Sequence, residues 1–367
     1  MPAVSPRRVM LTADAVGGVW RYALELAGGL VAHGTETVLA VLGPPPTDAQ
    51  RAEACDIVRL IETGLPLDWT ADNEQALARA SSELSGLASC IGAELVQLHA
   101  PAFAGLTRWP VPVVSVAHSC LGTWWRAVRG TDLPDDFAWR VAATARGLRA
   151  SEAVIAPSYA FADLLRATYG DDIVITVIHN GRRAPPETRA TRQLAVLTVG
   201  RLWDDGKNVV TLDRVANRLH APIYAAGPMK GPNGAAVSFQ NLHWLDELDE
   251  ATLQARYAEM TIFAAPALYE PFGLGVLEAA QSGMSLVLSD IPTFRELWDG
   301  PALFVTPRSE DEWLRSLGRL IDDPEIAARH GALARERARS YTVEAMVEGT
   351  EAVYRAVLPR NPVASVA

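Results

Sequence analysis

The sequence predicts an α/β fold of two Rossmann-like domains that face each other across a cleft. Short apolar segments of strand length alternate with helical segments almost to the end of the chain, as in parallel sheets covered by helices. The alternation occurs twice, and one polar, proline-rich segment at residues 181–189 separates the two runs as a linker. At 367 residues, the chain is long enough for two domains with separate cores.

The strands are expected where short apolar runs lie between turn residues. In the first run they are expected at residues 9–12, 37–42, 95–98, 111–117, 153–156 and 174–178. In the second run they are expected at residues 194–199, 223–226, 242–245, 262–265, 286–289 and 302–305. Ligands of such sheets bind outside the carboxyl ends of the strands, so we expect the site in the cleft.

Helices are expected between these strands and at the end of the chain. The first predicted helix covers residues 20–33, and the last three cover 312–321, 324–340 and 343–357. The linker gives a first domain at residues 1–185 and a second at residues 190–340. Residues 9–14 are too short and end too acidic for a signal peptide, so they are interpreted as the first strand.

The composition excludes several classes of protein. The formal net charge of −10 argues against a nucleic-acid partner, which would require a basic surface. The three cysteines are too few and too scattered for a disulfide framework or a metal site. No run of apolar residues is long enough to span a membrane. We therefore expect a soluble, cytoplasmic protein.

The most informative segment runs from Glu270 to Glu278. Pro271 and Gly273 interrupt the chain, and a buried helix is predicted from Val276 onward. The backbone N–H groups of Gly273, Leu274 and Gly275 are then free at a helix start, where the dipole favours an anion such as phosphate. Carboxylates on both sides of a phosphate site suit a ligand with hydroxyls at both ends, such as a sugar nucleotide.

Two cations follow the strand at residues 194–199. Arg201 and Lys207 lie in a loop at the carboxyl end of that strand, where a diphosphate would arrive. The alternative is a solvated loop in which Asp204 and Asp205 pair with the two cations. The nearby segment from Glu270 to Glu278 favours the phosphate interpretation.

The first half offers weaker signals at the ends of its strands. Gly17 and Gly18 open the first helix and allow close approach of a ligand, although a glycine pair by itself more often forms just a tight turn. His118 follows a buried strand and could donate to a sugar hydroxyl or to a backbone carbonyl. Trp124 and Trp125 form either a stacking wall for an acceptor or a core anchor for their helix.

Two charged segments are interpreted as structural. Residues 124–149 carry five arginines among three aspartates, which is typical of a solvated helical face, with weak contact to an anionic membrane surface as the alternative. In the acidic run at residues 246–250, Asp249 and Glu250 suit the first turn of a helix. No cluster of side chains has metal-ligand spacing, so no metal is expected.

Taken together, these motifs resemble the family-4 retaining glycosyltransferases of GT-B fold, also called glycosyl transferases group 1. The resemblance covers nearly the whole chain. It is carried by Gly200-Arg201-Leu202 with Lys207, by Gly227, and by the segments 266–274 and 278–283 with Glu296 before Gly300.

The resemblance implies transfer of a sugar from a nucleoside-diphosphate donor, with retention of configuration and without a metal or other cofactor. It assigns the donor sugar to Glu270, the ribose to Glu278, and the leaving diphosphate to Arg201 and Lys207. The amides of Phe272, Gly273, Leu274 and Gly275 would bind sugar and phosphate, and His118 and the Gly17-Gly18 loop would complete the site. A UDP- or GDP-sugar is the expected donor. In this family the last helix, here residues 343–358, folds back onto the first domain.

Several functions remain open at this point. A hydrolase using Glu270 and Glu278 as acid and base would leave Arg201 and Lys207 without a role. A sugar-nucleotide epimerase, a phosphorylase, and a degenerate sensor or scaffold that only binds sugar nucleotides are further alternatives. The acceptor is expected to be a small molecule, a glycan or a lipid-linked molecule. Its choice is expected to depend on the loops at residues 44–50 and 120–136.

Overall fold

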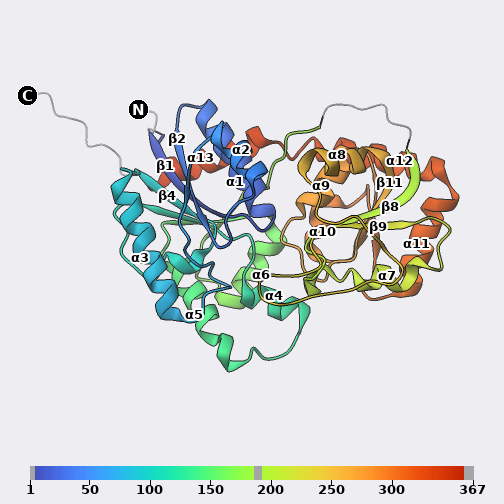
Figure 1. Cartoon of the computed structure of the whole chain (residues 1–367), viewed down its shortest axis with the longest axis horizontal. Helices are drawn as coiled ribbons and strands as arrows, with labels where there is room; N and C mark the ends of the chain where they lie inside the picture. Colours follow the sequence, from blue (N-terminus) through green and yellow to red (C-terminus); the bar gives the residue numbers. More distant parts are fainter. Residues whose placement is uncertain (1–4, 186–191, 359–367) are drawn as a thin grey trace, which may run out of the picture.

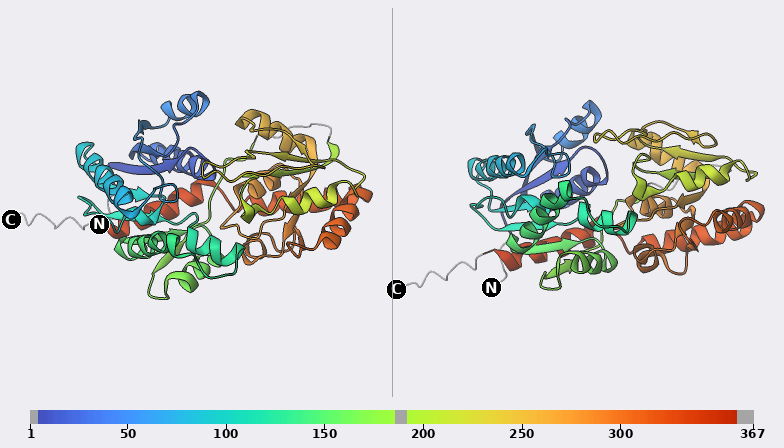
Figure 2. Two further views of the ribbon diagram at one scale, coloured as in Figure 1. Left: turned by 60° about the horizontal axis from the view of Figure 1, so that its bottom comes forward. Right: turned by 90° about the horizontal axis from the view of Figure 1, so that it is seen from below.

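The computed structural model describes residues 5–185 and 192–358, and each half of it contains one parallel sheet (Figure 1). Part of the predicted linker, residues 186–189, and the predicted first residue of the second domain, residue 190, lie outside the described residues. Figure 2 shows the two halves side by side with their loops turned toward each other.

Within the described residues, the first sheet has seven parallel strands in the order β3-β2-β1-β4-β5-β6-β7. The strands are β1 (Arg8–Asp14), β2 (Glu36–Leu42), β3 (Arg59–Glu62), β4 (Leu95–Leu98), β5 (Val113–Val116), β6 (Ala153–Ala156) and β7 (Ile175–Val177). The helices are α1 (Gly18–Ala32), α2 (Asp48–Cys55), α3 (Glu74–Cys90), the 3₁₀ turn η1 (Pro101–Phe103), α4 (Leu121–Val128), α5 (Asp135–Ala150) and α6 (Tyr159–Tyr169).

The second sheet, again within the described residues, has six parallel strands in the order β10-β9-β8-β11-β12-β13. The strands are β8 (Gln193–Val199), β9 (Ile223–Ala226), β10 (His243–Trp244), β11 (Met260–Ala265), β12 (Ser285–Ser289) and β13 (Leu303–Val305). The helices are the 3₁₀ turn η2 (Asp205–Lys207), α7 (Val210–Ala216), α8 (Glu250–Glu259), α9 (Leu274–Gln281), α10 (Pro292–Trp298), α11 (Glu310–Asp322), α12 (Pro324–Ala338) and α13 (Val343–Val357).

The predicted α/β alternation is confirmed, with each predicted strand present to within a few residues. One strand, β3, is absent from the prediction. It lies at the edge of its sheet, and its outer residues Arg59 and Glu62 are exposed. An edge strand needs no continuous apolar run, so its sequence lacks the signal that identified the buried strands.

The two sheets reverse their strand order at equivalent places. In the first sheet the order reverses between β1 and β4, and in the second between β8 and β11. The carboxyl ends of these strands lead into Asp14, His99, Arg201 and Pro266. Such switch points form crevices that bind ligands in doubly wound sheets.

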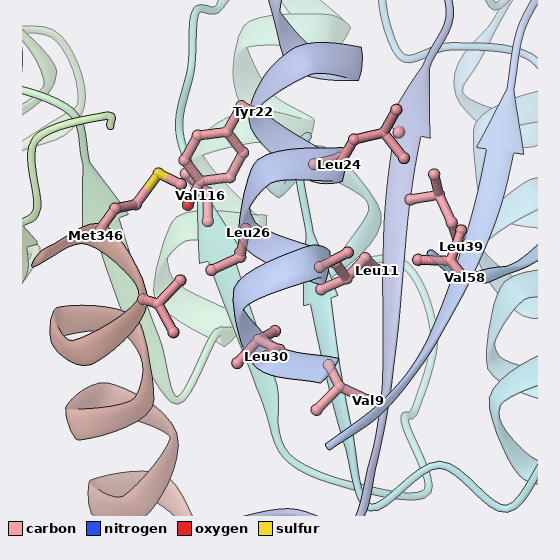
Figure 3. Packing of buried hydrophobic residues seen from close by; sticks show 14 of the residues in the cluster. Val9, Leu11, Tyr22, Leu24, Leu26, Leu30, Leu39, Val58, Val116 and Met346 are labelled. Atoms are coloured by element: carbon pink, nitrogen blue, oxygen red, sulfur yellow. The ribbon is translucent and has the colours of Figure 1, made fainter. Parts of the chain in front are cut away.

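The C-terminal helix α13 leaves the second half and packs against α1 of the first (Figures 1 and 2). Figure 3 shows the side chain of Met346 of α13 pointing toward Tyr22 of α1, close to Val116 of the first sheet. A Cβ atom at Gly29 would overlap Val347, so a glycine is what lets the two helices approach this closely. This packing is the return of the last helix that the resemblance implied.

The two connections between the halves touch each other. The backbone N–H of Arg182, after β7, donates to the carbonyl of Tyr341, just before α13, at 3.3 Å. The side chain of Gln281 in α9 donates to the carbonyl of Arg182 at 2.9 Å. Arg182 therefore lies where the two segments that connect the halves contact each other and helix α9. Across the described residues, no helix is both long and apolar enough to cross a membrane.

Candidate functional site

Two adjoining cavities lie between the halves. The larger, of about 400 Å³, is lined by the start of α1, the loop after β8 and the segment from Pro266 to Glu278; we call it the α9 cavity. The smaller, of about 290 Å³, is lined by Trp69, Trp124 and Trp203; we call it the tryptophan cavity. Their shared lining residues are Val19, His118, Ser119, Arg201 and Asp204. One ligand in each cavity would therefore meet the other.

The start of α9 presents free amides to the larger cavity. Gly273 caps the helix with φ of 93°, a left-handed conformation that favours glycine. Its carbonyl accepts from Val276 and Leu277 at 3.0 and 3.1 Å, which closes the first turn. Within the described chain, the N–H groups of Leu274 and Gly275 have no protein acceptor. These amides and the helix dipole make a site for an anion.

Glu270 and Lys207 meet beside these amides. Lys207 ends the turn η2, and its Nζ lies 2.5 Å from Glu270 Oε2. Both side chains are largely buried and both line the α9 cavity. The Lys207 ammonium is therefore paired with a carboxylate, and an anionic ligand could take the place of that carboxylate as its partner.

Arg201 is held by a buried aspartate. Its Nη2 lies 2.9 Å from Asp204 Oδ2, and the other Asp204 oxygen accepts from the indole of Trp124 at 2.9 Å and from the Gly206 amide at 2.8 Å. Burial alone would raise the pKa of Asp204, but two cations and two N–H donors outweigh it and lower that pKa. Asp204 thus stays ionised and orients Arg201 at the boundary of the two cavities.

Glu278 is buried one turn inside α9 and is held from two sides. Its Oε2 accepts from the Tyr257 hydroxyl at 3.1 Å. Its Oε1 lies 2.9 Å from Arg182 Nε, an ion pair in which the N–H points away from the ideal hydrogen-bond direction. Burial raises the pKa of Glu278 despite the opposing effect of Arg182. The carboxylate is oriented but keeps unused lone pairs toward the cavity.

Arg182 joins the two halves through its ion pairs. The side chain is 7 % exposed, and besides Glu278 it contacts Glu25 of α1 at 2.9 Å and Glu250 of α8 at 2.7 Å. Arg21 of α1 also reaches Glu250, at 3.0 Å. Burial disfavours the charged guanidinium, but the three carboxylates outweigh this effect and raise the pKa of Arg182. The network ties α1 of the first sheet to α8 and α9 of the second.

The glycine pair lies at the start of α1, opposite α9. Gly17 caps α1, and a Cβ atom there would meet open space. A Cβ atom at Gly18 would lie 3.3 Å from Leu274 of α9, so the two helix starts approach each other closely. Both glycines line the α9 cavity.

His118 and His99 stand edge to face, with ring centroids 5.0 Å apart. Burial lowers the pKa of His118 to about 3, so its imidazole is neutral near pH 7 and can donate or accept a hydrogen bond without carrying charge. Its Nε2 has no acceptor or donor among the described residues.

The tautomer of His99 is set by α13. The Tyr354 hydroxyl of that helix donates to Gln97 at 2.7 Å, and the Gln97 amide then donates to His99 Nε2, also at 2.7 Å. The hydrogen of His99 is therefore on Nδ1. Burial holds the pKa of His99 well below its ordinary value.

The tryptophan cavity is lined by two carboxylates that lie close enough for their charges to interact. Asp14 ends β1 and Asp68 follows β3; burial raises the pKa of both, and the charge of Asp14 contributes to raising that of Asp68 to about 6. Trp69 and Trp203, from opposite halves, stack with centroids 6.4 Å apart and planes 26° from parallel. The cavity thus combines acceptor oxygens with aromatic walls.

The Asp68 carboxyl makes folding pH-dependent in a direction that can be tested. Its folded pKa of about 6 is above the ordinary value of 3.8, so ionising it costs stability as pH rises through this interval. Asp68→Asn should therefore gain stability relative to the parent between pH 4 and pH 7, with the gain level above that. Melting temperatures at a series of pH values measure it, and Asp171→Asn, an exposed acid in the same half, should show no such trend. A gain that shrinks with rising pH would contradict the assignment.

The structure brings the predicted site residues together. Every one of them lines the α9 cavity: Glu270, Arg201, Lys207 and His118, with Gly17, Gly18, Phe272, Gly273, Leu274, Gly275 and Glu278. The alternative interpretation of the loop after β8, in which Asp204 and Asp205 pair with Arg201 and Lys207, is confirmed in part, because Arg201 pairs with Asp204. Asp205, however, pairs with Arg129 of the first half at 2.6 Å, and Lys207 pairs with Glu270.

Two sequence interpretations differ from the lining of the cavities. The loop at residues 44–50, which is expected to influence the choice of acceptor, lines neither cavity, whereas Leu67, Asp68 and Trp69 line the tryptophan cavity. These three residues follow β3, the strand without a sequence signal. The acidic run at 246–250 is not structural alone: Asp249 caps α8, but Glu247 and Glu250 line the α9 cavity.

Other expectations are resolved by the contacts. Trp124 lines the tryptophan cavity, whereas Trp125 packs on Phe137 away from it. Of the arginines at residues 124–149, Arg129, Arg146 and Arg149 pair with acids and Arg140 lines the cavity. Among the residues described, no group of His, Cys, Asp and Glu is arranged to hold a metal ion.

Arg182 and Tyr257 were missed by sequence reasoning. Arg182 falls in the segment interpreted as a linker, and a buried arginine between two domains leaves no periodic signal. Tyr257 lies on a helix face, where an aromatic residue normally indicates core packing. Only its hydrogen bond to Glu278, seen in the tertiary structure, distinguishes Tyr257 from an ordinary core residue.

Comparison with known proteins agrees with this geometry. Residues 16–183 match the family described as Glycosyltransferase Family 4, and residues 193–323 match Glycosyl transferases group 1. A glycogen synthase of Mycobacterium tuberculosis is 26% identical over 390 residues, covering 93% of this chain and 91% of its own. A D-inositol 3-phosphate glycosyltransferase of Corynebacterium glutamicum is 24% identical over 394 residues, covering 95% and 94%.

Solved structures share the fold. Sucrose-phosphate synthase from Thermosynechococcus elongatus superposes with a TM-score of 0.77 at 16% identity, over 95% of this chain and 98% of its own. Anabaena HepE, solved in complex with UDP and glucose, gives 0.74 at 14% identity, over 95% and 100%. The two family matches fall on the two sheets in turn and the fold is GT-B; the chain therefore belongs to the family-4, group 1 glycosyltransferases, and it is an enzyme of that class.

Proposed function

We propose that the protein transfers a sugar from a nucleoside-diphosphate sugar to an acceptor hydroxyl, with retention of configuration and without a metal ion. One observation carries the proposal: Arg201, Lys207 and the free amides of α9 converge on one cavity between the carboxylates Glu270 and Glu278. That order of charges matches the order of groups in a sugar nucleotide.

The diphosphate would bind at the start of α9. Its oxygens would accept from the amides of Leu274 and Gly275, and Arg201 would supply a planar fork of donors. Lys207 would exchange its pairing with Glu270 for pairing with the phosphate. Three sources of positive potential thus meet the leaving group, which removes the need for a divalent cation at this position.

The exchange at Lys207 has a consequence for Glu270. Once its partner turns to the phosphate, the Glu270 carboxylate is free to accept from hydroxyls of the donor sugar. Glu278, held by Tyr257 and Arg182, would accept from the ribose. Donor binding and the ordering of the sugar are therefore coupled through one ion pair.

For the chemical step we propose a front-face reaction. The leaving phosphate oxygen takes the proton of the acceptor hydroxyl as the bond to the anomeric carbon breaks, and the acceptor oxygen bonds to the same face of that carbon. Arg201 and Lys207 stabilise the charge that develops on the phosphate. The neutral imidazole of His118 would hydrogen-bond the sugar from the first half.

Substitution of the two glutamates should have different effects on nucleotide binding and on kcat. Glu278→Gln should weaken binding of UDP or GDP and of the sugar nucleotide alike, by about 10-fold, because a hydrogen bond to a charged group contributes about 1.5–3 kcal/mol. Glu270→Gln should leave binding of the nucleoside diphosphate nearly unchanged and lower kcat by about 100-fold. Calorimetric Kd values and steady-state rates check both. Equal effects of the two variants on nucleotide affinity would contradict the assigned roles.

The donor class is tested by thermal shift with UDP-, GDP- and ADP-sugars, since a ligand that binds the native state raises its stability. A donor that binds should also be turned over, with or without EDTA, and NMR of the product should show the donor's anomeric configuration. Absence of a shift with all three would refute the proposal. A shift without transfer or hydrolysis would instead indicate a sensor.

A further inference from the structure

We propose that the tryptophan cavity is the acceptor site and that its acceptor is a neutral, hydroxyl-rich carbohydrate or polyol that carries no phosphate. The inference rests on the proposed sugar transfer and adds the chemical class of the molecule that receives the sugar.

The position of the cavity suits an acceptor. It shares His118, Arg201 and Asp204 with the α9 cavity, so its occupant would touch the place proposed for the diphosphate and the donor sugar. It opens at the β1–β4 switch point of the first sheet, through Asp14 and His99. A hydroxyl bound here would lie on the side of Arg201 that faces the proposed site of the donor.

The walls suit the apolar face of a sugar ring. Trp69 of the first half stacks on Trp203 of the second, and Trp124 stands at the boundary with the α9 cavity. Aromatic faces bind the C–H groups of a ring, and the indole N–H groups donate to its hydroxyls. The indole Nε1 of Trp203 is buried and has no acceptor within the described protein. Trp124 by contrast is already committed to Asp204.

The charges select against an anionic acceptor. Asp14 and Asp68 line the cavity, and among the described residues neither forms an ion pair; Arg201 acts on Asp14 and Arg140 on Asp68 only through the weaker charge interaction of more distant groups. Asp14 accepts only the Val16 amide, at 2.9 Å, which leaves most of its lone pairs free. Carboxylates that form no ion pair accept well from hydroxyl groups. A phosphate placed between them would be repelled and would lose its hydration.

The cavity's arginines do not reverse this balance. Arg129 is paired with Asp205 and Arg201 with Asp204. Arg140 donates to the carbonyl of Ala71 at 2.6 Å and stacks over Trp139, 4.4 Å from the ring centroid. Arg129 and Arg201 are thus neutralised by acids. Arg140 forms no ion pair among the described residues and its buried Nε has no partner there, but its charge is opposed by Asp68 and Asp72. The carboxylates of Asp14 and Asp68 therefore still outnumber the one guanidinium of the cavity that lacks an ion pair.

The test uses acceptors in matched pairs with the donor identified by thermal shift. Glucose, myo-inositol and trehalose are compared with glucose 6-phosphate, inositol 3-phosphate and trehalose 6-phosphate, and transfer of labelled sugar is measured. We expect kcat/KM for the best neutral acceptor to exceed that of its phosphorylated counterpart by at least about 10-fold, a difference of about 1.4 kcal/mol. Preference for the phosphorylated member, or failure of every neutral polyol while donor binds, would overturn the inference.

Variants connect the preference to the two carboxylates. Asp14→Asn and Asp68→Asn should raise KM for the neutral acceptor about 10-fold and leave donor affinity unchanged, and Asp68→Lys should shift preference toward the phosphorylated member. Asp171→Asn, outside both cavities, should change neither value. Donor hydrolysis without acceptor reports separately on the proposed function: if donor binding itself is absent, that proposal fails rather than the acceptor class. Unchanged KM in both Asn variants would refute the assignment of these carboxylates.

Discussion

Lys207→Ala should lower kcat by about 100- to 1000-fold, the cost of removing one group that stabilises charge in a transition state. The reason lies in its surroundings: Lys207 is largely buried, 2.5 Å from Glu270, and beside the amides of α9. The loss should be in kcat more than in KM, because in the proposed transfer the leaving phosphate carries more charge in the transition state than in the bound donor. Steady-state kinetics with a labelled donor measure it.

The chain supplies an unusually clean control for this experiment. Lys207 and Lys230 are its only lysines, and Lys230 is exposed in the same half. Lys230→Ala should keep full activity. Acylation with an amine-reactive reagent should modify Lys230 at all times, whereas a nucleoside diphosphate should slow modification of Lys207. Full activity of Lys207→Ala, or labelling of Lys207 that the nucleotide does not affect, would contradict its role.

Arg182→Met should destabilise the protein by about 3–5 kcal/mol, because removing one partner of a buried ion pair leaves the other charges uncompensated. The carboxylates left behind are Glu278, 9% exposed, and Glu25, 15% exposed. The free energy of unfolding from urea titrations measures the loss. Arg183→Ala is the matched control, since this neighbouring arginine is exposed and should change stability little.

The pH dependence of the Arg182→Met defect gives an independent check. Without the guanidinium, the buried Glu278 can avoid its cost only by taking up a proton, and burial already raises its pKa. The deficit should therefore shrink as pH falls from 8 to 5. The variant should also bind nucleoside diphosphates more weakly, because Glu278 loses the partner that orients it. A deficit no larger than that of Arg183→Ala would show that the ion pairs of Arg182 contribute little.

Most of the fold could be predicted because its signals are local. Buried parallel strands are nearly continuous apolar runs, so the sequence predicts β1, β2 and β8 to within a few residues. The edge strand β3 is half exposed and carries no such run. The residues after it that line the tryptophan cavity, Leu67, Asp68 and Trp69, therefore had no sequence signal either.

The α9 cavity was predictable for a related reason. In parallel sheets the carboxyl ends of the strands meet at one edge, so residues that follow strands, such as Arg201 and His118, are brought together by topology alone. The segment from Glu270 to Glu278 adds a helix start whose free amides follow from Gly273 and the apolar run after it.

The pairing of charges was decided by the tertiary structure alone. That Lys207 rests on Glu270, that Arg182 joins Glu25, Glu250 and Glu278, and that Trp69 meets Trp203 are contacts between segments far apart in the chain. A periodic pattern describes which face of an element is buried, not what lies against it. The local sequence thus determines the strands, the helix starts and the chemical groups at their ends. Packing of the two halves determines which of those groups form ion pairs and which, like Asp14 and Asp68, form none among the described residues.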